Sequence, residues 1–325
     1  MNLEFPRDVL AARDRIGGDV RRTPLDRADG IGRGAAARVF IKWESEQTTG
    51  SFKLRGALNR LRTLSAEERS RGVVSASTGN HGLAISYAAR LEGVGLTLFL
   101  PRTAAAVKRA KIEATGVDVR TYGDDCAATE IHAREFAGRE GRFYVSPYND
   151  PAIVAGQGTV GVEVLEQAPD VDDIIVAIGG GGLITGIAGY LKAVKPETRI
   201  IGVEPETSAF MKASVEAGRL MDFPELPTVA DALAGGIEPG AITFPLCRDL
   251  VDVYLTVTER SIVEAMGMIR AACGKRVEGA AAVPIAALLG EPARFRGRTV
   301  VCVASGGNID PARFDALVNG LSSAA

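Results

Sequence analysis

The feature of this sequence that most constrains its fold is the repeated alternation of short apolar runs with segments of helical pattern. The apolar runs predict strands over residues 39–42, 73–76, 96–100, 117–120, 143–145, 174–178, 200–203 and 300–304. The intervening patterns predict helices over residues 7–16, 82–91, 104–115, 130–140, 183–194 and 261–273. Strands and helices that alternate in this way are typical of an α/β fold with a mainly parallel sheet.

The length of the chain predicts more than one folding unit. With 325 residues, the chain is long enough for about two domains. The segment from Ser65 to Asp150 contains several strand–helix units of its own, so we expect a second sheet inserted into a larger one. Ligands of such folds bind at the carboxyl ends of the strands, so functional residues are sought in the turns that follow strands.

The composition argues against several classes of function. The chain has 38 Lys and Arg against 40 Asp and Glu, whereas a general nucleic-acid binder needs a basic field. A membrane span needs about 18 apolar residues, and no apolar run approaches that length. The first residues lack the form of a signal peptide. The four cysteines form no CxxC pair, and the two histidines form no HExxH motif. We therefore expect a cytoplasmic protein that binds neither nucleic acid nor membranes.

The strongest local motif is a run of four glycines, Gly179 to Gly182, between a predicted strand and a predicted helix. Glycines let the backbone fold tightly and present successive N–H groups, and the start of a helix adds partial positive charge. The run fits neither the GxGxxG nor the GxxxxGK[ST] pattern, so the phosphate it suits is not that of a dinucleotide or of a P-loop nucleotide. The alternative interpretation is a tightly packed glycine turn.

Amine chemistry has few candidates in this chain. Only eight of the 38 basic residues are lysines, and arginine does not supply a nucleophilic amine. Lys53 lies in the segment Thr49 to Ala57, which opens a predicted helix. A cation at a helix start is electrostatically unfavourable, which helps to keep the amine neutral for Schiff-base chemistry. A surface lysine is the alternative interpretation.

Two further polar turns follow predicted strands. The turn Ser75 to Gly82 offers hydroxyls, glycines and a helix start that suit a carboxylate, although plain helix capping by Ser77 or Thr78 explains it as well. The turn Ala304 to Asn308 follows the last predicted strand and offers a serine hydroxyl. Together with the glycine run and Lys53, these turns place a phosphate cradle, an amine and a carboxylate loop at strand ends.

Taken in order, the motifs SFKLRGA, STGNHG, GGGGL and SGGN resemble those of the fold-type II pyridoxal 5′-phosphate (PLP) enzymes. The subgroup is that of serine/threonine dehydratases and serine racemases, and the likeness extends from Arg21 to Ser305. The resemblance implies a tryptophan synthase β-like fold with two open, twisted, mostly parallel sheets and helices on both faces. It implies a large PLP-binding domain of residues 1–60 and 151–325, and a small, mobile, inserted domain of residues 61–150.

The resemblance also implies the cofactor and its ligands. Lys53 is expected to form the Schiff base with PLP and then to act as the base for the Cα proton. Asn80 is expected at the phenolic oxygen of PLP, Ser305 at its pyridine nitrogen and Phe52 beside its ring. The expected phosphate ligands are Gly179, Gly180, Gly181, Gly182 and Leu183. Glu278 matches the family's glutamate near the cofactor, although Gly279 replaces the proline that usually follows it.

The residues expected to bind the substrate lie in the same turns. The substrate carboxylate is expected at Ser77, Thr78, Gly79, Asn80 and His81. Tyr148 and Gly236 are expected to shape a pocket roomier than one for threonine alone, because Tyr148 follows Pro147 where dehydratases more usually have phenylalanine. No metal is expected, because Phe210 stands where serine racemases have a metal-binding aspartate; Glu204 then serves as a capping or salt-bridging carboxylate.

The sequence therefore predicts a PLP-dependent dehydratase, or ammonia-lyase. Its expected substrate is a β-hydroxy-α-amino acid, either L-threonine or L-serine or a bulkier analogue such as 3-phenylserine. An amino-acid racemase stays open as the alternative, because Thr78 occupies the position of the racemases' second catalytic serine. A β-replacement synthase is disfavoured by GGGGL in place of a GTGGT-like loop, and a non-catalytic binding protein by intact Lys53, Asn80 and Ser305. A homodimer is expected from the resemblance alone.

Overall fold

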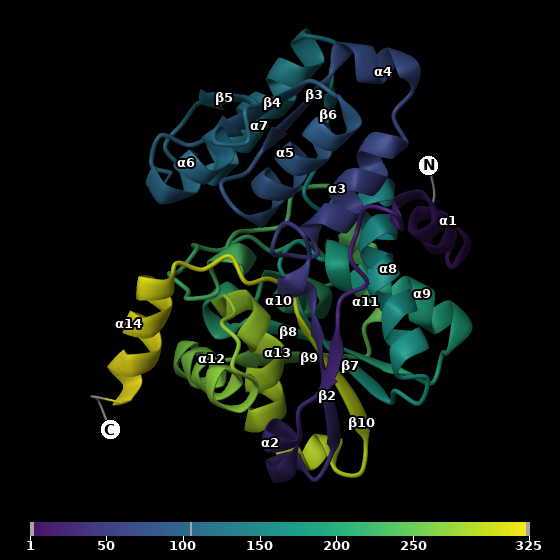
Figure 1. Cartoon of the computed structure of the whole chain (residues 1–325), viewed down its shortest axis with the longest axis vertical. Coiled ribbons are helices and arrows are strands. Elements are labelled where there is room, and N and C mark those ends of the chain that lie inside the picture. Colours follow the sequence, from purple (N-terminus) through teal and green to yellow (C-terminus); the bar gives the residue numbers. More distant parts are fainter. Residues whose placement is uncertain (1–2, 105, 323–325) are drawn as a thin grey trace.

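A computed structural model describes residues 3–104 and 106–322 and contains two sheets, one above the other in Figure 1. The six-stranded sheet has the order β1 (Leu25–Arg27), β2 (Arg38–Trp43), β10 (Thr299–Ala304), β7 (Asp173–Ala177), β8 (Arg199–Pro205), β9 (Val253–Val257). The four-stranded sheet has the order β5 (Asp118–Thr121), β4 (Leu96–Leu100), β3 (Val73–Ala76), β6 (Phe143–Tyr144). Only the pair β1–β2 is antiparallel within these two sheets of the described chain. The predicted α/β fold with two mostly parallel sheets is confirmed.

Helices cover both faces of the six-stranded sheet. On one face lie α1 (Arg7–Ile16), α8 (Pro151–Gln167), α9 (Gly182–Val194), α10 (Phe210–Ala217) and α11 (Thr243–Leu250). On the other face lie α2 (Asp29–Gly32), α12 (Glu259–Cys273), α13 (Gly279–Gly290) and α14 (Pro311–Ser322). In β7, Ile174 and Val176 pack on the first face while Ile175 and Ala177 pack on the second. Burial of both faces explains why these strands are continuous apolar runs.

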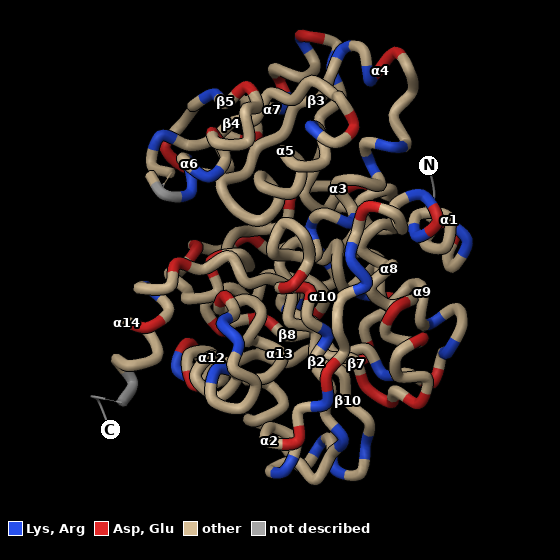
Figure 2. Tube along the Cα trace, in the orientation of Figure 1, with Lys and Arg blue, Asp and Glu red and all other residues tan. Residues whose placement is uncertain are grey.

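The four-stranded sheet is covered in the same way. One face packs against α3 (Lys53–Arg62), α5 (Asn80–Glu92) and α6 (Ala106–Glu113), and the other against α7 (Cys126–Arg139). The short α4 (Ala66–Arg71) has no buried residue and starts with a capping box between Ser65 and Glu68. Short 3-10 helices cover Arg33–Ala35, Glu44–Glu46, Glu206–Ser208, Asp231–Leu233 and Pro292–Phe295. Acidic and basic residues lie interspersed around both sheets (Figure 2).

Several predicted boundaries differ from the observed ones. The helix expected at residue 130 begins at Cys126, because the Asp125 side chain accepts a hydrogen bond from the backbone N–H of Ala128 and caps the helix. The helix predicted over residues 104–115 corresponds to α6, which covers Ala106–Glu113; residue 105 lies outside the described residues. All four strands of the small sheet lie within residues 61–150, whereas α3 runs across the predicted domain limit at residue 60. The domain limits and the mobility of the small domain stay predictions.

No helix within residues 3–104 and 106–322 is both long enough and apolar enough to cross a bilayer.

Candidate active site

A cavity of about 820 Å³ lies where turns from both sheets converge. The turns after β2, β3, β7 and β10 all contribute to its lining, as the rule for parallel sheets leads one to expect. The structure brings together in this lining every residue that the sequence predicted to bind cofactor or substrate: Phe52, Lys53, Ser77, Thr78, Gly79, Asn80, His81, Tyr148, Gly179, Gly180, Gly181, Gly182, Leu183, Gly236, Glu278 and Ser305.

The amine of Lys53 reaches this cavity from the first residue of α3. Its Nζ donates a 2.9 Å hydrogen bond to the backbone carbonyl of Pro147. Burial lowers the pKa of Lys53 to about 8, and the nearby Glu278 carboxylate opposes part of this shift. The neutral amine expected from the sequence is thus favoured, but its main cause is desolvation and not the start of the helix.

The four glycines form a tight turn between β7 and α9. Gly181 has a φ of +85°, in the left-handed region that favours glycine. A Cβ atom at Gly180 would overlap the Tyr148 ring, and one at Gly182 would lie 3.0 Å from the Tyr148 Cβ. A side chain is thus disfavoured at positions 180, 181 and 182. Because α9 begins at Gly182, its first N–H groups have no intrahelical partner. The turn therefore suits an anion such as a phosphate.

Asn80, the first residue of α5, is held by two partners. Its Nδ2 donates to Glu278 Oε1 at 2.7 Å, and its Oδ1 accepts from Asn308 Nδ2 at 2.7 Å. Asn308 also donates to the carbonyl of Thr49 at 2.9 Å. The amide orientation of Asn80 is therefore fixed, and its second N–H is left for another partner. The sequence prediction missed Asn308, although it belongs to the SGGN motif.

Glu278 is buried in the wall of the cavity. Burial raises its pKa to about 7, and the hydrogen bond from Asn80 partly counters this rise. A Cβ atom at Gly306 would overlap Glu278 Oε1, so the turn after β10 passes directly over this carboxyl group. The carboxyl group therefore carries a proton much more readily than an exposed glutamate.

Ser305 connects the end of β10 to the start of α3. Its carbonyl accepts a 3.1 Å hydrogen bond from the backbone N–H of Phe52, and Ser51 forms an isolated bridge with Gly306. Ser305 is buried at the cavity wall. The predicted pyridine ligand and the predicted amine are thus tied together through the backbone.

His81 is the last residue of the loop Ser77–His81, which the sequence predicted to bind the substrate carboxylate. Its Nε2 lies 3.0 Å from the Ser75 hydroxyl, which donates to the carbonyl of Val145 at 2.8 Å. Burial, and then the charge of Lys53, lower the pKa of His81 to about 3. The lowered pKa favours a neutral imidazole at neutral pH, so positive potential in this loop comes from the start of α5.

Tyr148, Gly235 and Gly236 all line the cavity. The Tyr148 hydroxyl accepts a 2.9 Å hydrogen bond from the backbone N–H of Glu238. A Cβ atom at Gly236 would come no closer than 3.8 Å to Phe210, and Gly235 has open space around it. The wall therefore has room beside Gly236.

Glu204 has the capping role expected of it. Its two carboxylate oxygens accept hydrogen bonds from the backbone N–H groups of Met211 at 2.9 Å and Lys212 at 2.8 Å, at the start of α10. Phe210, in the position of the racemases' aspartate, stacks on Phe223 with ring centroids 4.0 Å apart. The described residues contain no group of three or more His, Cys, Asp or Glu side chains arranged to hold a metal.

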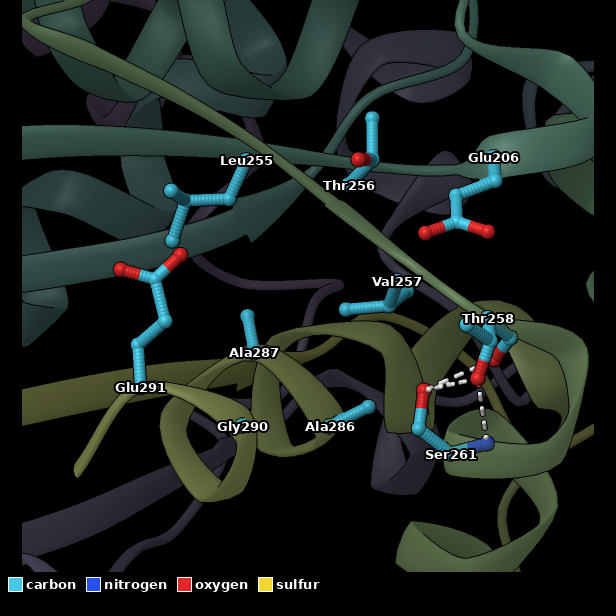
Figure 3. A pocket seen from close by; sticks show the side chains of 10 residues that line it. All are labelled: Glu206, Leu255, Thr256, Val257, Thr258, Ser261, Ala286, Ala287, Gly290 and Glu291. Carbon is cyan, nitrogen blue, oxygen red and sulfur yellow. Dashed lines mark hydrogen bonds between the residues drawn. The ribbon is translucent and has the colours of Figure 1, made fainter.

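A smaller pocket of about 240 Å³ lies beside β9, against the end of α13 (Figure 3). Its lining combines the apolar Leu255 and Val257 with Glu206, Glu291 and hydroxyl groups such as that of Ser261. None of the residues predicted to bind cofactor or substrate lies in it. We therefore place the active site in the larger cavity.

Comparison with known proteins identifies the family. The sequence matches the family described as pyridoxal-phosphate dependent enzyme over residues 16–306. The chain belongs to this family. Curated relatives of this PLP-dependent enzyme include a putative threonine dehydratase of Sinorhizobium fredii, 41% identical over 96% of this chain and 95% of the relative. An L-threonine ammonia-lyase of Thermotoga maritima is 38% identical over 96% of this chain and 77% of the relative.

Solved structures give the same assignment. A threonine deaminase isoform from Solanum lycopersicum has a TM-score of 0.90 and 32% identity, covering 96% of this chain and 91% of its own. Maize serine racemase has a TM-score of 0.90 and 33% identity, covering 98% of both chains. The enzyme is therefore a fold-type II PLP enzyme of the serine/threonine dehydratase and serine racemase subgroup.

The cavity fits PLP. The glycine turn, where a Cβ at position 180 would overlap Tyr148, suits the phosphate, and the buried amine of Lys53 suits the aldehyde carbon. The second N–H of Asn80 and the hydroxyl of Ser305 lie in the same wall and suit the phenolic oxygen and the pyridine nitrogen.

Proposed function

We propose that this enzyme is an ammonia-lyase that converts a β-hydroxy-α-amino acid to a 2-oxo acid and ammonia. L-threonine, L-serine and a bulkier analogue such as 3-phenylserine are the substrates we propose. The observation that carries the proposal is the single cavity in which the amine of Lys53, the glycine turn and the loop Ser77–His81 meet. The names of the threonine dehydratase and ammonia-lyase relatives support it.

Lys53 is the residue that we propose for attachment and for proton transfer. Bound PLP draws electrons from the Cα atom of an attached amino acid, which makes the Cα proton easier to remove. With a pKa of about 8, Lys53 is partly neutral near neutral pH, as a nucleophile and general base must be. Its hydrogen bond to the Pro147 carbonyl holds Nζ in the cavity.

Ser305 favours elimination over a long-lived carbanion. A serine hydroxyl does not protonate a ring nitrogen as a carboxylic acid would, so electron withdrawal in this site is moderate. Prompt loss of a β-hydroxyl group suits such a site. The anchored position of Ser305, next to the backbone of Phe52, supports its role as the ligand of the pyridine nitrogen.

The loop Ser77–His81 is our proposed carboxylate site. Gly79 donates its backbone N–H to the Ser77 hydroxyl at 3.2 Å, which shapes the loop ahead of α5. Neutral His81 adds no charge, so the backbone N–H groups and hydroxyls orient the carboxylate. The space beside Gly236 supports a substrate with a side chain larger than that of threonine.

A racemase is the second candidate, and Thr78 is the residue that favours it. Its hydroxyl lines the same cavity as Lys53, where it could relay a proton to the other face of the substrate. The likeness to maize serine racemase supports this alternative. Measuring D-serine formation against 2-oxo acid release from L-serine separates the two activities.

The decisive test uses a panel of β-hydroxy amino acids with wild-type enzyme and the Lys53→Ala variant. The wild-type enzyme should carry the absorbance band of lysine-bound PLP and release 2-oxo acid and ammonia in equal amounts. The variant should lose both. A wild-type protein without the band, or a variant with full activity, would refute the proposal.

We further propose a cytoplasmic homodimer. All four cysteines are free thiols, which is compatible with a reducing compartment. Light scattering on the purified protein would test the dimer, because a single species of monomer mass contradicts it.

A further inference from the structure

A buried ion cluster lies next to the first turn of α3, and the proposed reaction uses none of its members. We call it the Arg55 cluster; it consists of Lys42, Glu44, Arg55 and Glu163. The side chains of Lys42, Glu44 and Arg55 have no exposed surface, and that of Glu163 is 11% exposed. Its members come from β2, the 3-10 helix Glu44–Glu46 that follows β2, α3 and α8, so the cluster joins four elements of the fold.

Arg55 uses its whole guanidinium group in this cluster. It binds Glu44 through Nε and Nη2 at 2.8 Å each, and Glu163 through Nη1 at 2.6 Å and Nη2 at 3.0 Å. Nη1 also donates to the Thr159 hydroxyl at 3.2 Å, and Nη2 to the carbonyl of Arg21 at 3.3 Å. Bidentate contacts of this kind fix the orientation of the guanidinium group as well as its distance from the carboxylates.

The charges of the cluster balance within it. Lys42 donates to Glu163 at 2.5 Å, to the carbonyl of Thr23 at 2.8 Å and to Gln167 at 2.8 Å. Two cations thus face two carboxylates, and both carboxylates are occupied. Glu278, which lies outside the cluster, is the carboxylate that raises the pKa of Lys53.

Arg55 and Lys53 share the first turn of α3. The backbone N–H of Arg55 donates to the carbonyl of Phe52 at 3.0 Å, and that of Gly56 donates to Gln157 of α8 at 3.1 Å. A Cβ atom at Gly156 would lie 2.6 Å from the Cα of Gly56, so α3 and α8 meet backbone to backbone. The position of the Lys53 Cα atom therefore depends on the contacts that hold the first turn of α3.

We propose that Arg55 is a positioning residue for Lys53. Its guanidinium group binds both Glu44 and Glu163 and thereby holds the first turn of α3 against β2 and α8. This fixed turn orients the Lys53 amine toward the cavity. A cation in the first turn of a helix is otherwise unfavourable, and this turn contains no acidic residue that would compensate it. The inference rests on the proposed role of Lys53 as the reactive amine.

The test compares Arg55→Lys with a matched change elsewhere in the holoenzyme. Lysine keeps the charge of Arg55 but lacks its planar fork. The control is Asp173→Asn: Asp173 is a buried carboxylate at the start of β7, bound by Arg199 and Arg298 at distances between 2.6 and 2.9 Å. Each change weakens the ion pairs of a fully buried charged side chain, although the partners of Asp173 are partly exposed. Only Arg55 shares a helical turn with Lys53.

Four quantities are measured for each variant at saturating PLP: kcat, KM, the melting temperature and the pH titration of the cofactor absorbance band. We expect Arg55→Lys to lower kcat at least tenfold with KM within threefold, and to shift the titration, because small displacements of reacting groups strongly reduce rates. We expect Asp173→Asn to lower the melting temperature but to leave kcat within twofold and the titration unchanged.

Two outcomes overturn the inference: a wild-type kcat and titration in Arg55→Lys, or equal losses of kcat in both variants. If Arg55→Lys does not fold, Glu44→Gln is judged by the same criteria, since Arg55 then keeps its Glu163 contacts. Failure of the proposed function looks different, because the wild-type enzyme itself then lacks the absorbance band or Lys53→Ala keeps it.

Discussion

The aromatic ring of Tyr148 packs directly on the backbone of Gly180, leaving no space for a side chain at that position. The two residues are 32 positions apart, one after the small sheet and the other after β7. The glycine turn that we propose for the phosphate is therefore shaped by a neighbour from a distant part of the chain as well as by its own glycines.

Gly180→Ala should therefore weaken PLP binding at least tenfold, because the added methyl group displaces either the turn or the Tyr148 ring. Absorbance titration of cofactor-free protein with PLP measures this. Gly138→Ala is the matched control, since a Cβ atom there meets nothing within 4 Å and lies inside α7. It should keep PLP affinity and add about 0.5–1 kcal/mol of stability. Equal affinities of wild type and Gly180→Ala would contradict the assigned cradle.

The rate at which cofactor-free protein captures PLP should rise with pH and level off above about 8. Only the neutral amine of Lys53 attacks the aldehyde, and its pKa is lowered to about 8 by burial. Stopped-flow absorbance between pH 6 and 10 measures the profile. Because Glu278 raises the pKa of Lys53, Glu278→Gln should move the profile to lower pH. A profile that still rises at pH 10 would show an unperturbed amine.

Glu278→Gln should also stabilise the cofactor-free protein above pH 7. The pKa of Glu278 is about 7 in the folded protein, above its ordinary value of 4.5, so the folded state holds this proton more tightly than the unfolded state. Wild type then loses stability as pH rises from 4.5 through 7, whereas glutamine does not ionise. The variant should gain on the order of 3 kcal/mol at pH 8 and almost nothing near pH 4.5. Thermal melting at both pH values checks the sign.

Removal of divalent cations should leave kcat unchanged. The Glu204 carboxylate is used by two backbone N–H groups of α10, and Phe210 supplies no oxygen ligand beside it. Divalent cations prefer oxygen ligands, so this position is poorly suited to one. Assays after EDTA treatment, with and without added Mg²⁺, test the expectation. Activation by Mg²⁺ beyond twofold would be inconsistent with it.

Gly236→Val should narrow the substrate range. A side chain fits at Gly236 without clash, since the nearest atoms of Phe210 lie 3.8 Å from its Cβ position, and it would occupy space that a bulky substrate needs. We expect kcat/KM for 3-phenylserine to fall at least tenfold relative to that for threonine. A parallel loss for both substrates would place the side-chain pocket elsewhere.

The strands and the site turns were predictable because their signals are local. The glycine run and the apolar run before it place the cradle between β7 and α9 without any distant contact. By contrast, α13 is rich in alanine and contains Pro284, so its sequence carries little helical periodicity and tertiary packing decides its structure. The Arg55 cluster was equally hidden, because its four members are spread from residue 42 to residue 163.

The pKa of Lys53 likewise depends on contacts that the local sequence does not show. Its position at a helix start was visible in the sequence, but the burial that lowers its pKa comes from surrounding elements. Asn308 shows the converse case. The SGGN motif marked the loop, yet only the folded chain shows the amide of Asn308 fixing that of Asn80.

The position of β10 has a consequence for how the enzyme is made. This strand is the last of the described chain in sequence, yet it lies between β2, which leads to Lys53, and β7, which leads to the glycine turn. During synthesis the first nine strands emerge without the strand that joins these two halves. We therefore expect the six-stranded sheet to close only after residues 299–304 have been made, and PLP to be bound after that step.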